Sequence, residues 1–176
     1  LRSPIVNGAA APAADEAAPI DPVQLRRALG SFVTGVTVVT TLTPAGEPVG
    51  LTVNSFNAVS LSPPLVLWSL ALSAASFEAF DHASHFAVNV LAQDQRALSE
   101  RFARTGGDKF GGVAWRKGIG GLPLLDGSAA HFACRTAMRY PGGDHLILIG
   151  EVLAHEHTER VPLVYARGRY ARIAQG

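Results

Sequence analysis

The chain has little cysteine: Cys134 is the only one among its 176 residues. One thiol excludes an intrachain disulfide, and it also excludes a zinc site built from several cysteines. Because small secreted domains often depend on disulfides, we expect a reducing, cytoplasmic location. Cys134 falls on the apolar face of an alternating segment, where we expect an inert core residue.

Long apolar runs and an excess of one charge are also missing. No apolar run reaches the roughly 18 residues that a helix needs to cross a bilayer, so we expect no membrane contact. Fifteen basic and 14 acidic residues leave a net charge of +1. No basic run stands out, so nucleic acid is not an expected partner.

The composition indicates one folded domain. Hydrophobic residues make up 48% of the chain and charged residues 16%, which is typical of a globular protein. Residues 1–20 are rich in alanine and proline and lack a basic start followed by an apolar stretch. We expect a disordered tail there, not a signal peptide, and a single domain over residues 21–176.

Helix patterns are few and short. Asp21 suits the N-cap of a first helix, Gln24 would complete a capping box, and Gly30 would end the helix. Spacings of three and four between aromatic or leucine residues predict two more helices, over residues 73–83 and 93–103.

Strand patterns dominate the rest of the chain. We predict strands over residues 35–41, 48–56, 59–61, 65–70, 86–91, 129–140, 145–155 and 163–173. A parallel sheet would need long helical crossovers, which are mostly missing. The chain is therefore predicted to be mainly β, with short helices and a closed or nearly closed antiparallel barrel. The long loop 105–122 holds seven glycines, and loops of this length are often functional.

The segment 129–140 alternates as a half-buried strand does. One predicted face carries Ala130, Phe132, Cys134, Thr136 and Met138, and the opposite face carries His131, Arg135 and Arg139.

Polar side chains gather where the second predicted strand ends, over residues 52–56. Asn54 and Ser55 offer hydrogen bonds that suit a ring edge bearing carbonyls and nitrogens, such as that of an isoalloxazine. The alternative is a strand end whose side chains satisfy their own turn, and the pattern alone favours that alternative.

Two further places combine suitable groups. His145 follows Asp144 at a turn before a strand, where it can reach a ligand or simply stabilise the turn. Arg101 and Lys109 flank the start of the glycine-rich loop and suit a phosphate. The alternative for Arg101 is compensation of a helix dipole, with Phe102 in the core.

Several familiar sites are excluded. His155 and His157 share a face, but no third ligand follows at useful spacing, so we expect no metal. The glycine spacing before Lys109 does not match a phosphate-binding P-loop, and no Gly-x-Gly-x-x-Gly supports a Rossmann site. No Ser-His-Asp set can be assembled from spacing.

Eight motifs, in order, resemble the short-chain flavin reductase family, whose members include reductase components of two-component flavin-dependent monooxygenases. The resemblance runs from about residue 25 to residue 173. It is carried by LGSFVTGVTVVTT (29–41), GLTVNSF (50–56), VSLSPPLV (59–66), FAVNVL (86–91), RF with DKF (101–102 and 108–110), GDH (143–145), GEV (150–152) and RGRY (167–170).

The resemblance implies a flavin-reductase-like split barrel of antiparallel Greek-key type, usually a homodimer. It implies an NAD(P)H-dependent reductase that supplies reduced FMN or FAD by diffusion to a monooxygenase, with NADH or NADPH as co-substrate. Neither the flavin nor the donor is distinguished further. The implied flavin contacts are Thr37, Thr52, Val53, Asn54, Ser55, Phe56, Ala58, Val59, Ser73, Ala74, Ala75, Ser76, Arg101, Phe102, Lys109 and Phe110, and the implied NAD(P)H contacts are His145, Arg167, Gly168, Arg169 and Tyr170.

The implied reaction needs no catalytic side chain. Hydride passes from the nicotinamide to the flavin, so the cofactors carry the chemistry and the protein supplies position. Two departures from the family pattern bear on binding. The phosphate-facing loop 73–76 lacks the basic residue often present there, and Val53 replaces a residue that is commonly smaller.

Three alternatives stay open. A split barrel of this kind can reduce another final acceptor, such as cobalamin or a ferric chelate. It can also hold flavin without turnover as a regulatory module. A haem-binding split barrel is the third alternative.

Overall fold

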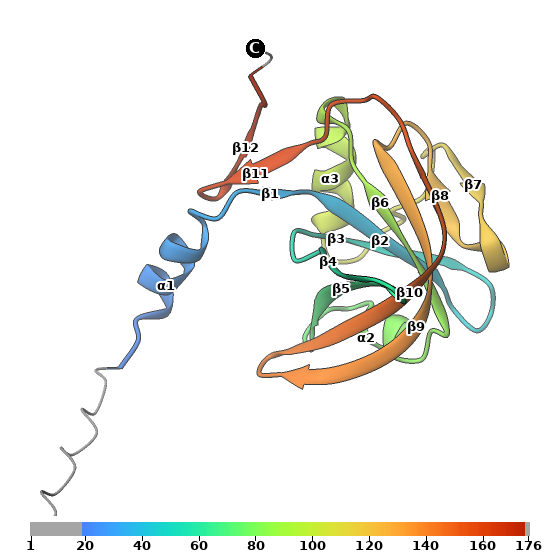
Figure 1. Ribbon diagram of the computed structural model, residues 1–176, viewed down its shortest axis with the longest axis horizontal. Helices are drawn as coiled ribbons and strands as arrows, with labels where there is room; N and C mark the ends of the chain where they lie inside the picture. The colour runs from blue at the N-terminus through green and yellow to red at the C-terminus, as the bar shows by residue number, and fades with distance from the viewer. Residues whose placement is uncertain (1–18, 175–176) are drawn as a thin grey trace, which may run out of the picture.

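A computed structural model describes residues 19–174, and Figure 1 shows its arrangement. Residues 1–18 of the expected tail lie outside the described part. Seven antiparallel strands form the main sheet, in the order β3-β2-β6-β9-β10-β5-β4. Their bounds are β2 (Thr37–Leu42), β3 (Pro48–Val53), β4 (Asn57–Leu61), β5 (Pro64–Ala71), β6 (His85–Val90), β9 (Ala130–Gly142) and β10 (His145–His157).

Two small sheets and three helices complete the described fold. The small sheets are β1 (Thr34–Gly35) with β11 (Val164–Ala166) and β12 (Arg169–Ala171), and β7 (Trp115–Lys117) with β8 (Pro123–Leu125). The helices are α1 (Pro22–Leu29), α2 (Phe77–Asp81) and α3 (Arg96–Ala103). The predicted mainly β, antiparallel fold is confirmed.

The main sheet curves around an aromatic core. Trp68 of β5 meets Phe80 of α2 and Phe86 of β6 edge to face, at ring-centroid distances of 5.1 and 5.9 Å. All three side chains are fully buried, and each buried aromatic contributes on the order of 2–3 kcal/mol to folding. Gly150 of β10 is required beside Phe86, because a Cβ there would overlap the ring and come within 2.9 Å of the Cβ of Cys134.

A second aromatic cluster anchors the glycine-rich loop. Phe102 of α3 is fully buried and packs edge to face on Phe110, at 5.0 Å, and Phe110 packs on Trp115 at 5.9 Å. The loop predicted over 105–122 therefore has apolar anchor points, and it also contains β7 and a short 3₁₀ turn, Ile119–Gly121.

Several predicted element boundaries were wrong. β3 ends at Val53 instead of residue 56, and the strand expected over 59–61 begins at Asn57. The helix predicted over 73–83 is only α2, because tight turns precede it, and the one predicted over 93–103 starts as a 3₁₀ turn. The last predicted strand, 163–173, is the hairpin β11–β12, because Arg167 and Gly168 adopt positive φ and turn the chain.

His131 lies on the face of β9 opposite Phe132 and Cys134, as predicted, but this face is covered here and His131 is only 7% exposed. The β7–β8 ribbon covers the outer face of the sheet here: Leu122 and Leu124 cluster with Ala87 and Ala133. A sheet that is covered on both faces has no solvent-facing side. In the first half of β9, the alternation of polar and apolar residues therefore does not indicate which side chains are exposed.

The first helix begins after Asp21 and ends before Gly30, as predicted, but Gln24 forms no capping box with Asp21. Asp21 accepts a hydrogen bond from the Val23 amide at 2.8 Å, and Gly30 forms the C-cap. None of the residues of α1 is buried, and Figure 1 shows the helix standing away from the barrel. No helix within residues 19–174 is long and apolar enough to span a membrane.

Candidate functional site

A cavity of about 460 Å³ lies between β3, the start of α2 and the glycine-rich loop. We call it the lysine cavity. Its lining includes Gly50, Ala75, Ser76, Gly106, Gly107 and Lys109. Residues that the sequence predicted to face a flavin phosphate, Ala75, Ser76 and Lys109, therefore meet in one cavity.

Lys109 is the cation of this cavity. Its Nζ donates to the carbonyl oxygen of Phe102 at 3.0 Å and approaches that of Gly50 at 3.4 Å. Burial lowers the pKa of Lys109, because desolvation disfavours its charged form. An ammonium has three donors, so one remains for a ligand. The Ser76 hydroxyl is also available, since it makes no capping bond to α2.

The remaining residues of the predicted phosphate set have structural contacts. Arg101 donates to the carbonyl oxygens of Asp108 and Gly111, at 3.1 and 2.5 Å, and so shapes the loop. Phe102 and Phe110 pack in the aromatic cluster. In the loop 73–76, Ala74 packs against the main core.

A second cavity of about 220 Å³ lies where β3 ends beside the hairpin β11–β12. We call it the tyrosine cavity. It is lined by Val36, Thr52, Val53, Asn54, Ser99, Ala103, Tyr165 and Tyr170. Here the structure brings predicted flavin contacts, Thr52 to Asn54, together with one predicted nucleotide contact, Tyr170.

Ser99 of α3 joins the two walls of the tyrosine cavity. It was not among the site residues predicted from the sequence. Its carbonyl oxygen accepts a hydrogen bond from the Thr52 hydroxyl at 2.7 Å. Its own hydroxyl lies 2.9 Å from the Tyr170 hydroxyl. Ser99 is fully buried, and its spacing of three from the buried Phe102 is the pattern that could have revealed it.

Tyr170 is held on a second side as well. The Arg96 guanidinium lies 4.9 Å from the centre of the Tyr170 ring, a cation–π contact. Tyr165 packs edge to face on the same ring at 5.4 Å. These contacts hold Tyr170 in place at the tyrosine cavity.

Asn54 is the open polar side chain at the end of β3. It is exposed, and no side-chain hydrogen bond engages it within the described part of the chain. Thr37 is buried and donates to the Val53 carbonyl at 3.2 Å. Ser55 is engaged too, because its hydroxyl accepts from the Ser69 amide at 2.9 Å.

The other predicted contacts near this strand end differ in exposure. Phe56 packs against Phe132, with ring centroids 5.6 Å apart. Ala58 and Val59 are exposed on β4, the edge strand of the main sheet.

His145 lies apart from the hairpin β11–β12. It pairs with Ala71 at the end of β5, next to the loop 73–76, and Figure 1 shows the β9–β10 turn well away from β11–β12. Its Nδ1 lies 2.6 Å from Asp144 Oδ1, and this hydrogen bond lowers the pKa of Asp144. The predicted NAD(P)H contacts thus form two separate groups within one chain.

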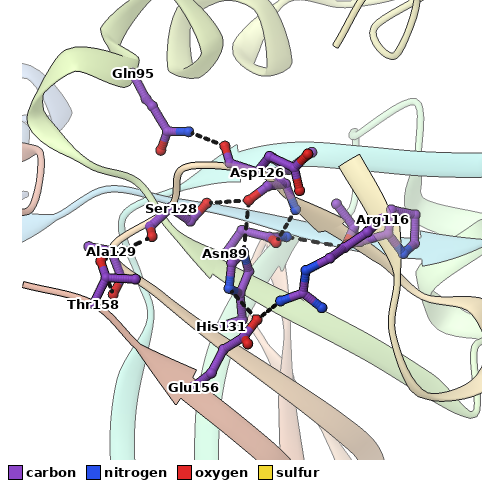
Figure 2. Close-up of polar contacts among 12 residues, drawn as sticks. Asn89, Gln95, Arg116, Asp126, Ser128, Ala129, His131, Glu156 and Thr158 are labelled. Carbon is purple, nitrogen blue, oxygen red and sulfur yellow. Dashed lines mark hydrogen bonds and ion pairs between the residues drawn. The ribbon is translucent and has the colours of Figure 1, made fainter. Parts of the chain in front are cut away.

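A buried polar network holds the β7–β8 ribbon to the barrel (Figure 2). Asn89 of β6 accepts from the Leu125 amide at 2.8 Å and donates to the Val38 carbonyl at 3.0 Å. His131 lies 2.8 Å from the Leu125 carbonyl oxygen and 2.9 Å from Glu156, which also pairs with Arg116. Burial lowers the pKa of His131. These contacts are structural.

The remaining titratable side chains form neither a metal site nor a reactive thiol within the described residues. Within residues 19–174, no group of three or more His, Cys, Asp or Glu side chains is placed to hold a metal ion. Cys134 is fully buried, and burial raises the pKa of its thiol to about 12. It is therefore an unreactive core residue, as the sequence predicted.

Comparison with known proteins agrees across most of the chain. Residues 29–174 match the family model described as "Flavin reductase like domain". The chain is 49% identical over 150 residues to "FMN reductase (NADH) SmoA" of Agrobacterium fabrum, covering 85% of each sequence. It is 46% identical over 147 residues to "Flavin-dependent trigonelline monooxygenase, reductase component" of Acinetobacter baylyi, covering 84% of this chain and 47% of that protein.

Solved structures agree as well. The fold matches the NADH:FAD oxidoreductase SgcE6 of Streptomyces globisporus with a TM-score of 0.84 and 41% identity, over 91% of this chain and 99% of that one. A second structure of SgcE6, in complex with NAD and FAD fragments, matches with a TM-score of 0.83 and 42% identity, over 90% and 98% of the two chains.

Proposed function

The chain belongs to the flavin reductase-like family, and we infer that it is an NAD(P)H:flavin oxidoreductase that reacts at the tyrosine cavity. One observation supports this location above the others. Asn54, at the end of the flavin-facing strand, lines the same cavity as Tyr170 of the nucleotide-facing hairpin. The two reacting rings must meet at about 3–3.5 Å, so their binding surfaces have to share a cavity.

The described residues fit a flavin. The open amide of Asn54 suits the ring edge, because it can both donate and accept. The lysine cavity suits the phosphate, with the Lys109 ammonium and the Ser76 hydroxyl as donors. When bound, flavin and nicotinamide supply the hydride chemistry, while this chain binds them, orients them and shields them from water.

The lysine cavity compensates for the loop 73–76, which carries no basic residue. The cation of this cavity, Lys109, comes from the glycine-rich loop. Its ammonium also donates hydrogen bonds to two backbone carbonyls. We therefore propose moderate flavin affinity, with flavin acting as a diffusing substrate. Reduced FMN or FAD would then pass to a monooxygenase, the role named for the reductase component from A. baylyi. The single buried thiol supports a cytoplasmic location.

We propose that the protein is a homodimer. The apolar side chains of α1 and the segment after it are largely exposed in the described chain: Leu25 is 45% exposed, Leu29 65%, Phe32 75% and Val33 58%. Water-exposed apolar surface of this kind normally marks an interface. A second copy of this chain is the simplest cover, since a twofold interface buries the same patch twice.

The direct test is oxidation of NADH followed at 340 nm with purified protein and free flavin. We expect rapid, flavin-dependent loss of absorbance, with little loss when flavin is left out. FMN, FAD and riboflavin are then compared as acceptors, and NADH and NADPH as donors. If folded protein turns over no donor–acceptor pair, the reductase function is excluded and a non-catalytic flavin-binding module takes its place.

A further inference from the structure

A third cavity, of about 530 Å³, lies between α1 and the turn of the hairpin β11–β12. We call it the arginine cavity. Its lining consists of Val23, Arg26, Arg27, Gly30, Ser31, Arg167 and Gly168. The α1 residues follow the spacing of one helical face, so this face of α1 points toward its own hairpin. Leu25 and Leu29 lie on the other side of the helix.

The two walls of the arginine cavity are tied together. The Arg167 amide donates to the Gly30 carbonyl oxygen at 2.6 Å, so the end of α1 and the hairpin turn form one unit. Arg167 has a φ of 50°, and it is the one described residue other than glycine with a positive φ. Such a backbone is uncommon for a residue other than glycine; here it serves the tight hairpin turn, and it fixes the direction in which the Arg167 side chain leaves that turn.

The charge of the cavity is unbalanced. Arg26, Arg27 and Arg167 line it together, and none of them forms an ion pair with a carboxylate within residues 19–174. Three guanidinium groups around one space repel one another, and a bound anion would remove this repulsion. Their planar donors match phosphate oxygens, often in pairs of hydrogen bonds.

The position of the hairpin indicates which anion fits. Tyr165 and Tyr170, paired in the middle of its strands, line the tyrosine cavity, while Arg167 and Gly168 at its turn line the arginine cavity. One residue on each strand, Ala166 or Arg169, separates a tyrosine from the turn, a backbone distance of roughly 7 Å. A nicotinamide nucleotide has the same layout, a reactive ring joined through a ribose to a diphosphate. The flavin phosphate already has a site in the lysine cavity, which shares no lining residue with this one.

We propose that the arginine cavity binds the diphosphate of the nicotinamide nucleotide, with Arg26, Arg27 and Arg167 as its ligands. The proposal rests on the reductase function argued above and adds two ligands from α1. The donor then lies along β11–β12, with its nicotinamide in the tyrosine cavity.

The test compares two hydride donors, NADH and 1-benzyl-1,4-dihydronicotinamide, which has no phosphate. In the double variant Arg26→Gln/Arg27→Gln, kcat/KM for NADH should fall by about tenfold or more, the usual loss of charge-assisted hydrogen bonds. Turnover of the benzyl donor and the KM for FMN should not change. Arg172→Gln is the matched control, because Arg172 is exposed after β12 and does not line the cavity.

A second variant tests the other wall. Arg167→Asn removes the charge and keeps a residue that tolerates positive φ, and it should show the same loss for NADH alone. Isothermal titration with ADP-ribose, which carries the diphosphate without nicotinamide, should detect binding to the wild-type protein and much weaker binding to the double variant.

Each other outcome overturns the proposal. Equal losses with both donors would show that the arginines only maintain the structure. A raised KM for FMN or FAD would assign the cavity to the flavin. Unchanged kinetics in the arginine variants would show that the cavity does not bind the nucleotide and would assign it to an anionic partner protein. Wild-type protein that turns over neither donor would instead refute the reductase function itself.

Discussion

Lys109 holds the glycine-rich loop, and we propose that it also binds the flavin phosphate. Its ammonium holds the backbone of Phe102 and Gly50, and it faces the lysine cavity beside Ser76. The neighbouring cation, Arg101, is instead bound to two loop carbonyls. Of the two basic residues that the sequence offered for a phosphate, only Lys109 lines this cavity.

Replacing Lys109 should therefore weaken phosphate binding in particular. In Lys109→Met, the KM for FMN should rise by about tenfold, because a charge-assisted hydrogen bond is lost. The KM for riboflavin, which has no phosphate, should change little. Steady-state kinetics with both flavins measure this difference. Equal increases for FMN and riboflavin would mean that Lys109 only supports the loop.

Among the elements, the β7–β8 ribbon is held to the barrel chiefly by one buried side chain, that of Asn89. Asn89 lies inside the barrel wall, and its side chain bonds to both β2 and Leu125 at the end of β8. Its oxygen satisfies an amide that would otherwise be buried without a partner. Although Asn89 is a polar residue within an apolar stretch of sequence, its side chain joins β6, β2 and β8.

Asn89→Ala should destabilise the protein by about 1–3 kcal/mol, the cost of leaving a buried amide without a partner. Urea denaturation measures the change, and hydrogen exchange should show earlier opening around Leu125. Asn57→Ala is the matched control: the Asn57 side chain accepts from the exposed Ala58 amide at 2.9 Å, where water can replace it. Equal losses in the free energy of unfolding would show that the buried position of Asn89 adds nothing to its contribution.

At the scale of the whole molecule, α1 projects from the barrel and does not pack on it. The helix turns its basic face to the hairpin β11–β12 and its leucines to solvent. Figure 1 shows it projecting from the barrel, where a second copy can cover it. The arginine cavity and the proposed dimer surface thus use opposite sides of one short helix.

The dimer is expected to depend on those leucines. Sedimentation velocity should give twice the 18.4 kDa chain mass for the wild type. Leu25→Glu/Leu29→Glu should shift it toward the monomer, because two charges would enter an apolar interface. Leu153→Glu, an equally exposed leucine substitution on β10, should leave the mass unchanged. A wild-type monomer at micromolar concentration would refute the dimer.

Local sequence was enough for the fold class and for most of the helices and strands, although it missed β7, β8 and several boundaries. Asp21 and Gly30 bound α1 because capping depends on neighbouring residues. The runs of β-branched residues form strands, and the shortage of helical crossovers indicates antiparallel pairing. The ordered motifs resembled the family to which the chain belongs.

Only the tertiary structure decided which side chains face the ligand surfaces. Ser99 meets Thr52 and Tyr170, which lie 47 and 71 residues away in the chain. His131 is buried because the β7–β8 ribbon, just before β9 in the chain, folds back over that strand. His145 is separated from the hairpin β11–β12, although the resemblance assigned both to the nucleotide. Arg26 and Arg27 belong to the proposed nucleotide site only because the fold places α1 beside Arg167. Sequence patterns report neighbours along one element, whereas a cavity is made where distant elements meet.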